Sequence, residues 1–405
     1  MRFLIITQDL RVSGTSQGII ERSFLAKLRK SYPKSVIDVE YIIHTNTEDD
    51  LHLLPVDHIQ KHIVDIKIPV STIFFNRFYW RLFHVSLKEL YIQKQYAKII
   101  SVIDYRDYDY IFIRSAGIDC EAILAAHNLP ILKKAYITFN EPYPYFWCAG
   151  NYERLSNLHL FRLKKMLSVV EQAKGCIATK FLARDMQFLY GTRKSFFDLP
   201  HQFVDSVFEI KKTKSSFFKS KKVSISYHGA IQFGRNLDDL LDVYCELIKE
   251  NNNIKENTEF FVRLKSSEFN RLKAKYLEID NIYILEGVDF STSYYEQSII
   301  SDINISLENG PIYCSVLLGK APLLDFVRKR ILSLSPLSSE MREIIKNDKY
   351  VATYGNNEEI KNKLKVLIEE VLKDEIYDGE VFDNYFSDAN FKKQLDEILQ
   401  SKKLF

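Results

Sequence analysis

The amino-acid sequence predicts an α/β protein of two domains, each built on a doubly wound parallel sheet. At 405 residues the chain is too long for one compact core and suits two domains of about 150 to 200 residues each. Short β-rich apolar runs alternate with helical spacing, which is typical of parallel sheets. A lysine-rich tract at 211–222 interrupts this alternation near mid-chain. We therefore expect domains over 1–198 and 223–375, a linker over 199–222, and a C-terminal helical segment over 376–405 that packs back on the first domain.

The composition excludes several classes of protein. Hydrophobic residues make up 46% of the chain and charged residues 27%, which excludes disordered and fibrous proteins. The 56 Lys and Arg against 53 Asp and Glu leave a net charge of +3, too small to indicate a nucleic-acid partner. The five cysteines include no CxxC pair and predict reduced thiols, with no zinc site. Because no secretory region and no run of roughly 20 apolar residues is present, we expect a cytoplasmic protein.

The first half of the chain begins with a strand, a glycine-bearing loop and a helix over Ile19–Leu28. The loop contains Ser13 and Gly14, whose hydroxyl and amide groups could receive a phosphate or sugar hydroxyls. A plain turn between strand and helix is the simpler explanation, since the loop is neither GxGxxG nor a Walker A sequence. The strands predicted in this half are Phe3–Thr7, Asp38–Ile43, Val64–Ile68, Tyr110–Ile113, Ala135–Thr138 and Gly175–Ala178.

An aromatic and basic stretch occupies Thr72–Ile100, where Arg77, Arg81, Lys88 and Lys94 are interleaved with Phe, Tyr and Trp. A helix of this composition can lie on an anionic membrane surface, with its rings at the level of the headgroups. We favour a core helix whose aromatic side chains face the sheet, because both of its faces are partly apolar. Under the alternative, the protein would contact the inner face of the cell membrane.

Two polar residues follow the predicted strand Ala135–Thr138. Asn140 and Glu141 stand directly before Pro142, and loops after strands often carry binding residues. We expect both side chains at the mouth of a cleft between the domains. The alternative is a polar turn with aromatic packing.

The second half repeats the alternation and contains a compact strand–loop–helix–strand unit over Asp302–Pro336. Ligands collect at the carboxyl ends of parallel strands, which is where Glu308, Asn309 and Gly310 fall. Asp325 lies on the following helix, and the alternative for the two acids is a solvated loop and a helix surface. The predicted strands are Val223–Tyr227, Phe260–Leu264, Ile282–Leu285, Ile303–Leu307, Ile331–Leu334 and Tyr350–Thr353.

Arg235 stands just before a predicted helix over Asn236–Lys249. Its guanidinium and the amides of the helix N-terminus could together neutralise a diphosphate. The alternative for any single arginine is a surface cation.

These motifs, in two consecutive Rossmann-like halves, resemble those of the GT-B glycosyltransferases. In Leu199–Phe208, the residues Pro200, Val204, Asp205 and Phe208 match the hinge pattern of that superfamily.

The segment Tyr227–Arg235 is similar to the phosphate-binding segment of glycosyltransferase family four. Gly229 matches the glycine of that family and Ala230 replaces its arginine. Arg235 occupies the place of the lysine that contacts the donor diphosphate. Lys265 falls in the phosphate-side loop after a strand, and Val288 falls in the segment that packs near the base.

In the same family two acids hold the donor sugar and the ribose, usually with seven residues between them. Glu308 and Asp325 align with these acids, but sixteen residues, 309–324, intervene here. The resemblance also implies that Ser13 and Gly14 lie near the diphosphate and that Asn140 lies beside the transferred sugar.

The resemblance implies a GT-B fold, two Rossmann-like domains with parallel doubly wound sheets facing a cleft. It further implies a hexosyltransferase that moves a sugar from a nucleotide-sugar donor to a glycan or lipid-linked acceptor in bacterial-type surface polysaccharide synthesis. Retention of configuration and independence from metals and other cofactors are expected. The alternatives are an inactive scaffold of the same fold or a nucleotide-sugar epimerase. The expected catalytic residues are Glu308, Arg235, Glu141 and Asn140; the expected donor-binding residues are Ser13, Gly14, Gly229, Lys265, Val288, Asn309, Gly310 and Asp325.

Overall fold

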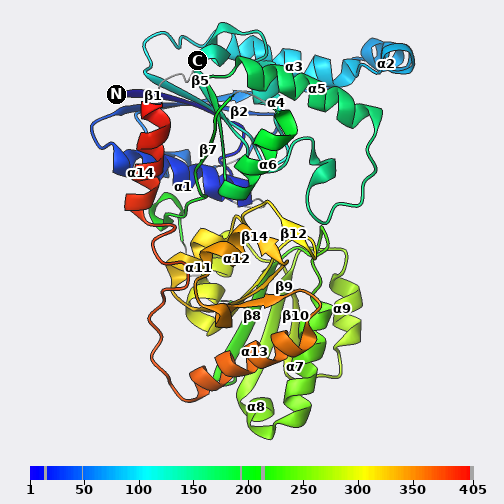
Figure 1. Cartoon of the computed structure of the whole chain (residues 1–405), viewed down its shortest axis with the longest axis vertical. Coiled ribbons are helices and arrows are strands. Elements are labelled where there is room, and N and C mark those ends of the chain that lie inside the picture. The colour runs from blue at the N-terminus through cyan, green and yellow to red at the C-terminus, as the bar shows by residue number, and fades with distance from the viewer. Residues whose placement is uncertain (13–15, 48, 192–193, 211–214, 402–405) are drawn as a thin grey trace. The chain divides into compact units, whose positions relative to one another are not determined.

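The computed structural model describes residues 1–12, 16–47, 49–191, 194–210 and 215–401, and the chain forms two compact units (Figure 1). The first unit comprises Met1–Cys148, Tyr152–Phe208 and Ser387–Phe405, and the second comprises Ala149–Asn151 and Glu209–Phe386.

Both unit boundaries differ from the ranges that the sequence suggested. Parts of the expected linker, 199–222, belong to the units: Leu199–Phe208 lies in the first, and Phe217 stacks on Phe261 in the second at a ring distance of 4.2 Å. The expected C-terminal segment, 376–405, divides between Phe386 and Ser387, and only the part from Ser387 onward belongs to the first unit.

The first unit contains a seven-stranded sheet in the order β3-β2-β1-β4-β5-β6-β7, with every pair of neighbours parallel. The order runs outward from β1 in both directions, so it reverses between β1 and β4, as in Rossmann folds. The strands are β1 (Arg2–Thr7), β2 (Val36–Ile43), β3 (His58–Ile63), β4 (Tyr110–Arg114), β5 (Ala135–Thr138), β6 (Gly175–Ala178) and β7 (Phe196–Asp198).

The two edge strands of this sheet were not predicted correctly. The strand expected at Val64–Ile68 lies instead at β3, His58–Ile63, and β7 was not expected. Neither edge strand contains a buried residue, whereas all four residues of β5 and of β6 are buried. Because an edge strand buries little side-chain surface, its sequence lacks the apolar run that marks a central strand.

The helices of the first unit include α14, which comes from the far end of the chain and packs on α1. Phe391 of α14 meets Phe24 of α1 at a ring distance of 6.1 Å, and the Tyr136 hydroxyl donates to the Ile398 carbonyl at 2.9 Å. The helices are α1 (Ser16–Ser31), α2 (Val70–Phe83), α3 (Leu87–Ile100), α4 (Glu121–Ala125), α5 (Asn157–Gln172), α6 (Lys180–Tyr190) and α14 (Asp388–Gln400).

The aromatic stretch forms two helices, and the prediction that it packs against the sheet is wrong for α2. His84 adopts a left-handed conformation that ends α2, and the Ser86 hydroxyl accepts from the Glu89 amide to begin α3. No residue of α2 is buried, whereas α3 buries Tyr96 and Ile100. The sheet face is therefore covered by α3, and α2 projects beyond it (Figure 1).

The second unit contains a six-stranded parallel sheet in the order β10-β9-β8-β11-β13-β15, which reverses between β8 and β11. Its strands are β8 (Val223–Gly229), β9 (Thr258–Leu264), β10 (Ile282–Glu286), β11 (Ile303–Leu307), β13 (Arg330–Ser335) and β15 (Val351–Thr353), and a separate pair is formed by β12 (Tyr313–Cys314) and β14 (Ser338–Ser339). Its helices are α7 (Asp238–Glu250), α8 (Asn252–Asn257), α9 (Phe269–Lys275), α10 (Phe290–Tyr295), α11 (Ala321–Val327), α12 (Glu340–Ile344) and α13 (Asn357–Leu372).

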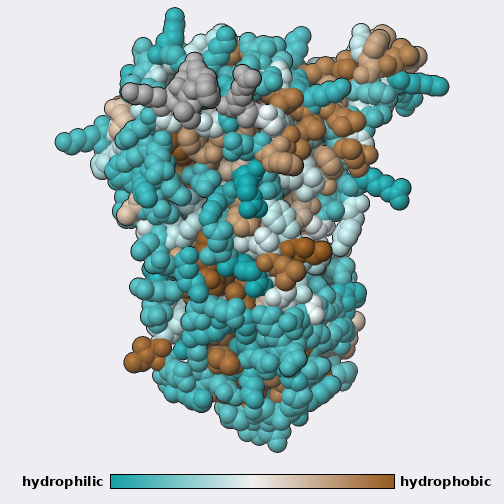
Figure 2. Space-filling view, in the orientation of Figure 1, coloured by the Kyte–Doolittle hydropathy of each residue, from teal (hydrophilic) through white to brown (hydrophobic). Residues whose placement is uncertain are grey.

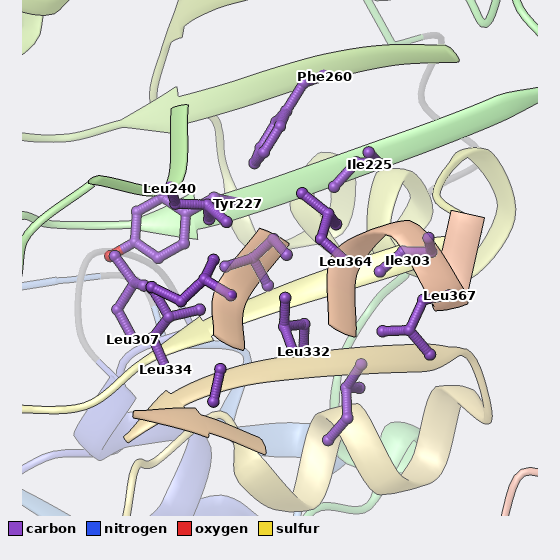
Figure 3. Packing of buried hydrophobic residues seen from close by; sticks show 14 of the residues in the cluster. Ile225, Tyr227, Leu240, Phe260, Ile303, Leu307, Leu332, Leu334, Leu364 and Leu367 are labelled. Atoms are coloured by element: carbon purple, nitrogen blue, oxygen red, sulfur yellow. The ribbon is translucent and has the colours of Figure 1, made fainter. Parts of the chain in front are cut away.

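The core of the second unit lies between this sheet and its helices. Figure 3 shows Ile225 and Tyr227 of β8, Leu332 of β13 and Leu364 and Leu367 of α13 meeting in one cluster. The labelled residues are all buried, and burying a leucine-sized side chain contributes about 1.5–3 kcal/mol. This packing fixes the ends of β8 and β11.

Among the described residues, no helix has both the length and the apolar character to cross a membrane.

Candidate functional site

The carboxyl edge of the second sheet brings several predicted residues together. Gly229 ends β8, Lys265 follows β9, Val288 stands two residues after β10 and Glu308 follows β11. Since all six strands are parallel, these positions share one edge. The reversal of strand order between β8 and β11 marks the place where such sheets bind ligands.

The loops after β8 and β11 are joined by hydrogen bonds. The Gly310 amide donates to the Phe233 carbonyl at 3.0 Å, and Arg235 Nε donates to Asn309 Oδ1 at 2.9 Å. Gly310 has a φ of +69°, and a Cβ there would lie 3.2 Å from the Tyr313 carbonyl oxygen. A side chain at this position would therefore be strained and crowded. The structure holds Arg235, Asn309 and Gly310 in one assembly.

Arg235 is half-buried and fixed at two points. Besides the bond to Asn309, its Nη1 donates to the Ala230 carbonyl at 3.2 Å. That carbonyl also accepts the Tyr227 hydroxyl at 2.9 Å. Within the described ranges, Arg235 forms no ion pair with a carboxylate. Its charge is thus held in place without a protein counter-ion.

Lys320 is a second cation of this cluster that sequence reasoning missed. Its Nζ donates to the His228 and Ile305 carbonyls, both at 3.3 Å, and lies 4.6 Å from the centre of the Tyr227 ring. Burial, and then the charge of Arg235, lower the pKa of Lys320 to about 7. The only sequence signal was a lysine immediately before a helix in the long stretch between the two predicted acids.

Glu308 is fully buried, so it is not a solvated loop acid. Its Oε2 accepts the Ser339 hydroxyl at 2.7 Å, and its Oε1 has no hydrogen-bond partner in the described part of the chain. Burial raises the pKa of Glu308 to about 7, while the hydroxyls of Ser335 and Ser339 and the charge of Arg342 act in the opposite direction. The carboxyl group can therefore act as hydrogen-bond donor or acceptor near neutral pH.

Asp325 contacts other residues than Glu308 does. It sits on α11, where Arg328 is its ion-pair partner at 3.9 Å, whereas the hydroxyl partner of Glu308 comes from β14. The longer stretch between the two acids thus leaves them with different partners.

The predicted residues of the first unit have mixed outcomes. Ser13 and Gly14 lie outside the described residues. Asn140 is buried, and its Nδ2 donates to Glu21 Oε1 at 3.0 Å and to the Ser115 carbonyl at 3.1 Å. Glu141 is half-buried and lies beside Gly117. A Cβ built on that glycine would be 3.8 Å from Glu141 Cγ.

A small polar cavity of the first unit adjoins Asn140. Arg114 and His201 also line it, and burial followed by the charge of Arg114 lowers the pKa of His201 to about 3. Thr179 Oγ1 and Gln202 Oε1 are buried without a hydrogen-bond partner among the described residues. The cavity has about the volume of one water molecule, and Thr179 and Gln202 are among the residues that line it.

No cluster of three or more His, Cys, Asp or Glu side chains in the described part of the chain is arranged to hold a metal ion.

Comparison with known proteins finds similarity only at the level of structure. No family model matches the chain, and no curated protein sequence matches it. The lipopolysaccharide outer core galactosyltransferase WaaB is 13% identical over 98% of both chains, with a TM-score of 0.56. S. aureus TarM, solved with fondaparinux, α-GlcNAc-glycerol and UDP, is 9% identical over 99% of this chain and 100% of its own, with a TM-score of 0.63.

An enzyme of a different class is similar to the same extent. The UDP-GlcNAc 2-epimerase of Neisseria meningitidis, solved with UDP-GlcNAc, is 12% identical over 98% of this chain and 99% of its own, with a TM-score of 0.57. At identities this low, the TM-scores and the near-complete coverage of both chains establish the fold alone. Together with the two parallel sheets, they confirm the prediction of two Rossmann-like units of the GT-B type.

Proposed function

We propose that this protein is a glycosyltransferase that binds a nucleotide-sugar donor at the carboxyl edge of the second sheet. The observation that carries the proposal is Arg235, held by Asn309 and Ala230 beside the β8–β11 reversal without a carboxylate partner in the described residues. A diphosphate is the anionic group that nucleotide sugars would present there. The fold shared with a galactosyltransferase supports the same reaction class.

The chemistry follows from where charge develops. Breaking the bond between sugar and diphosphate leaves negative charge on the nucleotide, and a cation already in position stabilises it without reorganisation. Arg235 fills this role in the proposal, and Glu308 offers its unpartnered Oε1 to a donor hydroxyl. Glu308 thus orients the sugar.

Further roles rest on the resemblance of the sequence. Gly229, Lys265, Val288 and Gly310 surround the donor, Asp325 reaches its ribose, and Ser13 and Gly14 approach the diphosphate. Asn140 and Glu141 serve the acceptor side, with Glu141 as a candidate base.

We further propose that the reaction retains the configuration of the sugar and needs no metal, because side chains supply the positive charge. Transfer should then persist in excess EDTA. Proton NMR of the first product should show the same anomeric configuration as the donor.

The proposed acceptor is a glycan or a lipid-linked precursor of a surface polysaccharide. WaaB is named as a galactosyltransferase of the lipopolysaccharide outer core, and TarM was solved with α-GlcNAc-glycerol. An acceptor at a membrane would require this protein to reach that membrane, and α2 supplies a surface for it.

The surface of α2 is apolar and flanked by cations. Phe74, Phe75 and Phe78 are 54–56% exposed, and Leu82 is 70% exposed. Figure 2 shows apolar side chains gathered over this helix. Arg77 and Arg81 lie on the same helix, and no Asp or Glu occurs between residues 67 and 88. We propose that α2 lies in the interface of an anionic membrane.

Two observations favour other functions of the same site. The structural similarity to a UDP-GlcNAc 2-epimerase favours donor isomerisation, and Ala230 in place of the family arginine favours an inactive scaffold. Incubation with UDP-, GDP-, dTDP- and CMP-sugars, with and without a membrane glycolipid extract, separates the three. Transfer to the extract supports the proposal. Conversion of donor without acceptor indicates an epimerase, and binding without turnover indicates a scaffold.

A further inference from the structure

We propose that Lys320 binds the donor diphosphate together with Arg235, and that donor binding therefore changes with pH. This inference rests on the proposed function and adds a residue that the family resemblance does not assign.

The position of Lys320 is built by the two strands at the reversal of the sheet. The His228 carbonyl belongs to β8 and the Ile305 carbonyl to β11, and both accept from Lys320 Nζ at 3.3 Å. The ring of Tyr227, also on β8, lies 4.6 Å from the same nitrogen. Two carbonyls and a ring face orient an ammonium group but do not neutralise it.

Lys320 and Arg235 belong to one cluster. The Tyr227 ring lies against Lys320, while its hydroxyl shares the Ala230 carbonyl with Arg235 Nη1. The charge of Arg235 also disfavours the ammonium form of Lys320. The two neighbouring positive charges repel each other, and a bound anion would reduce this repulsion.

The carboxylates of the neighbourhood have other partners. Glu308 Oε2 accepts from Ser339, Asp325 pairs with Arg328, and Glu296 pairs with Arg263 at 2.6 Å. Within the described ranges, no ion pair reaches Lys320 or Arg235. The cluster thus has excess positive charge beside a polar loop. This charge is complementary to the negative charge of a diphosphate.

The groups that face Lys320 determine how the cluster responds to pH. From β8 these are Tyr227 and His228, and from the following loop Arg235. Burial raises the pKa of Tyr227 and lowers that of His228 well below its ordinary value, so both are neutral near pH 7. Lys320, whose pKa burial lowers to about 7, therefore gains charge as pH falls through 7.

A diphosphate favours the ammonium form, so binding draws a proton onto Lys320 and weakens as pH rises above 7. Glu308 ionises over the same range, since burial raises its pKa to about 7, and its negative charge would act in the same direction. Replacing Lys320 by arginine separates the two effects, because arginine stays charged throughout.

The test is calorimetric titration. Wild type is first titrated with UDP-GlcNAc, GDP-mannose, dTDP-glucose and ADP-glucose, and the donor that binds most tightly is then used throughout. Their diphosphates carry esters at both ends and do not titrate between pH 6.5 and 8.5. We expect wild-type affinity to fall about 25-fold over this range, because the protonated fraction of a lysine with a pKa of about 7 falls from about three-quarters to about 3%. At pH 7, titrations in two buffers of different ionisation enthalpy should show uptake of about half a proton, because about half of the lysine is uncharged at its pKa.

Three variants complete the design. Lys320→Met should bind at least tenfold more weakly at pH 6.5. Lys320→Arg should keep its affinity at that pH and lose the part of the proton uptake that belongs to Lys320, so that any uptake left is that of Glu308. Lys249→Met, on the exposed end of α7, should match wild type. Wild-type affinity and proton uptake in Lys320→Met, with weaker binding in Arg235→Ala, would overturn the role of Lys320 and leave the proposed function standing. If none of the four donors binds wild type, the proposed function and this inference both fail.

Discussion

Glu308 is a carboxyl group in a place that solvates an anion poorly. It is fully buried, and the Ser339 hydroxyl donates to its Oε2 at 2.7 Å. The protonated form is accordingly favoured up to about pH 7, the value to which burial raises its pKa. In the unfolded chain the same group ionises at its ordinary value of 4.5.

This difference predicts how stability varies with pH. Between pH 4.5 and 7 the native state keeps a proton that the unfolded state releases, so the stability from this group is lost as pH rises through 7. The loss is about 3 kcal/mol, at roughly 1.4 kcal/mol per pH unit. Glu308→Gln keeps an acceptor for Ser339 and removes the titration, so its stability should fall less between pH 4.5 and 8.

Urea denaturation of wild type and Glu308→Gln at both pH values measures the effect. Glu256→Gln, an exposed substitution in the same unit, serves as the control and should follow wild type. An identical loss of stability in wild type and Glu308→Gln would show that Glu308 is ionised in the native state at neutral pH.

The residue scale also shows where sequence reasoning stops. The place of Glu308 at a strand end could be predicted, because the apolar run of β11 ends one residue earlier. Its burial could not, since Ser339 is 31 residues away in sequence and comes from another strand. Lys320 was missed because its surroundings, the His228 and Ile305 carbonyls and the Tyr227 ring, converge only in the folded sheet.

At the scale of elements, α2 differs from the helices around it. Its neighbour α3 begins at a Ser86 cap and buries Tyr96 and Ile100, whereas α2 buries nothing. Its composition alone could not decide between core and surface, because a helix that is apolar on most sides fits either. The deciding fact is that α3 already covers the sheet.

The membrane proposal for α2 predicts co-sedimentation with vesicles that contain anionic lipid. Replacing Phe74, Phe78 and Phe83 by Gln should reduce binding at least tenfold, because each buried ring contributes about 1.5–3 kcal/mol. Binding should also weaken at high salt, since Arg77 and Arg81 contribute electrostatically. Phe188→Gln, at a residue 89% exposed on α6, should bind as wild type does. Vesicle binding that survives the triple substitution would remove α2 from the membrane contact.

The C-terminal helix α14 predicts a second effect at this scale. Phe391 is fully buried and packs on Phe24, so Phe391→Ala leaves a cavity and should cost about 3–5 kcal/mol. Thermal unfolding of this variant should show loss of stability in the first unit. Phe188→Ala, which removes the same ring from an exposed position, should leave the melting curve unchanged. Equal curves for wild type and Phe391→Ala would mean that α14 does not stabilise that unit.

At the scale of the whole molecule, the two units have separate sheets and separate cores. Two Rossmann-like halves were predictable because central parallel strands are apolar on both faces and repeat regularly. The boundaries between the units were harder to predict from the sequence. The polar tract that suggested a linker includes Phe217, which packs in the second unit, and the last helix returns to the first.

Separate cores predict that a donor stabilises one unit more than the other. In differential scanning calorimetry, a nucleotide sugar at 100 times its Kd should stabilise the second unit by about 2.7 kcal/mol. The transition of the first unit is identified as the one that Phe391→Ala lowers. A donor that raised only that transition would place the principal binding site in the first unit.

The central claim is that Arg235 holds the donor diphosphate at the carboxyl edge of the second sheet, and nucleotide-sugar binding to wild type and Arg235→Ala tests it most directly. We predict at least a tenfold loss of affinity at pH 7, about 1.4 kcal/mol, with partial recovery in Arg235→Lys. Arg271→Ala, which removes an ion-paired surface arginine of α9, should bind as wild type does. Equal affinity of wild type and Arg235→Ala for the same donor would contradict the claim.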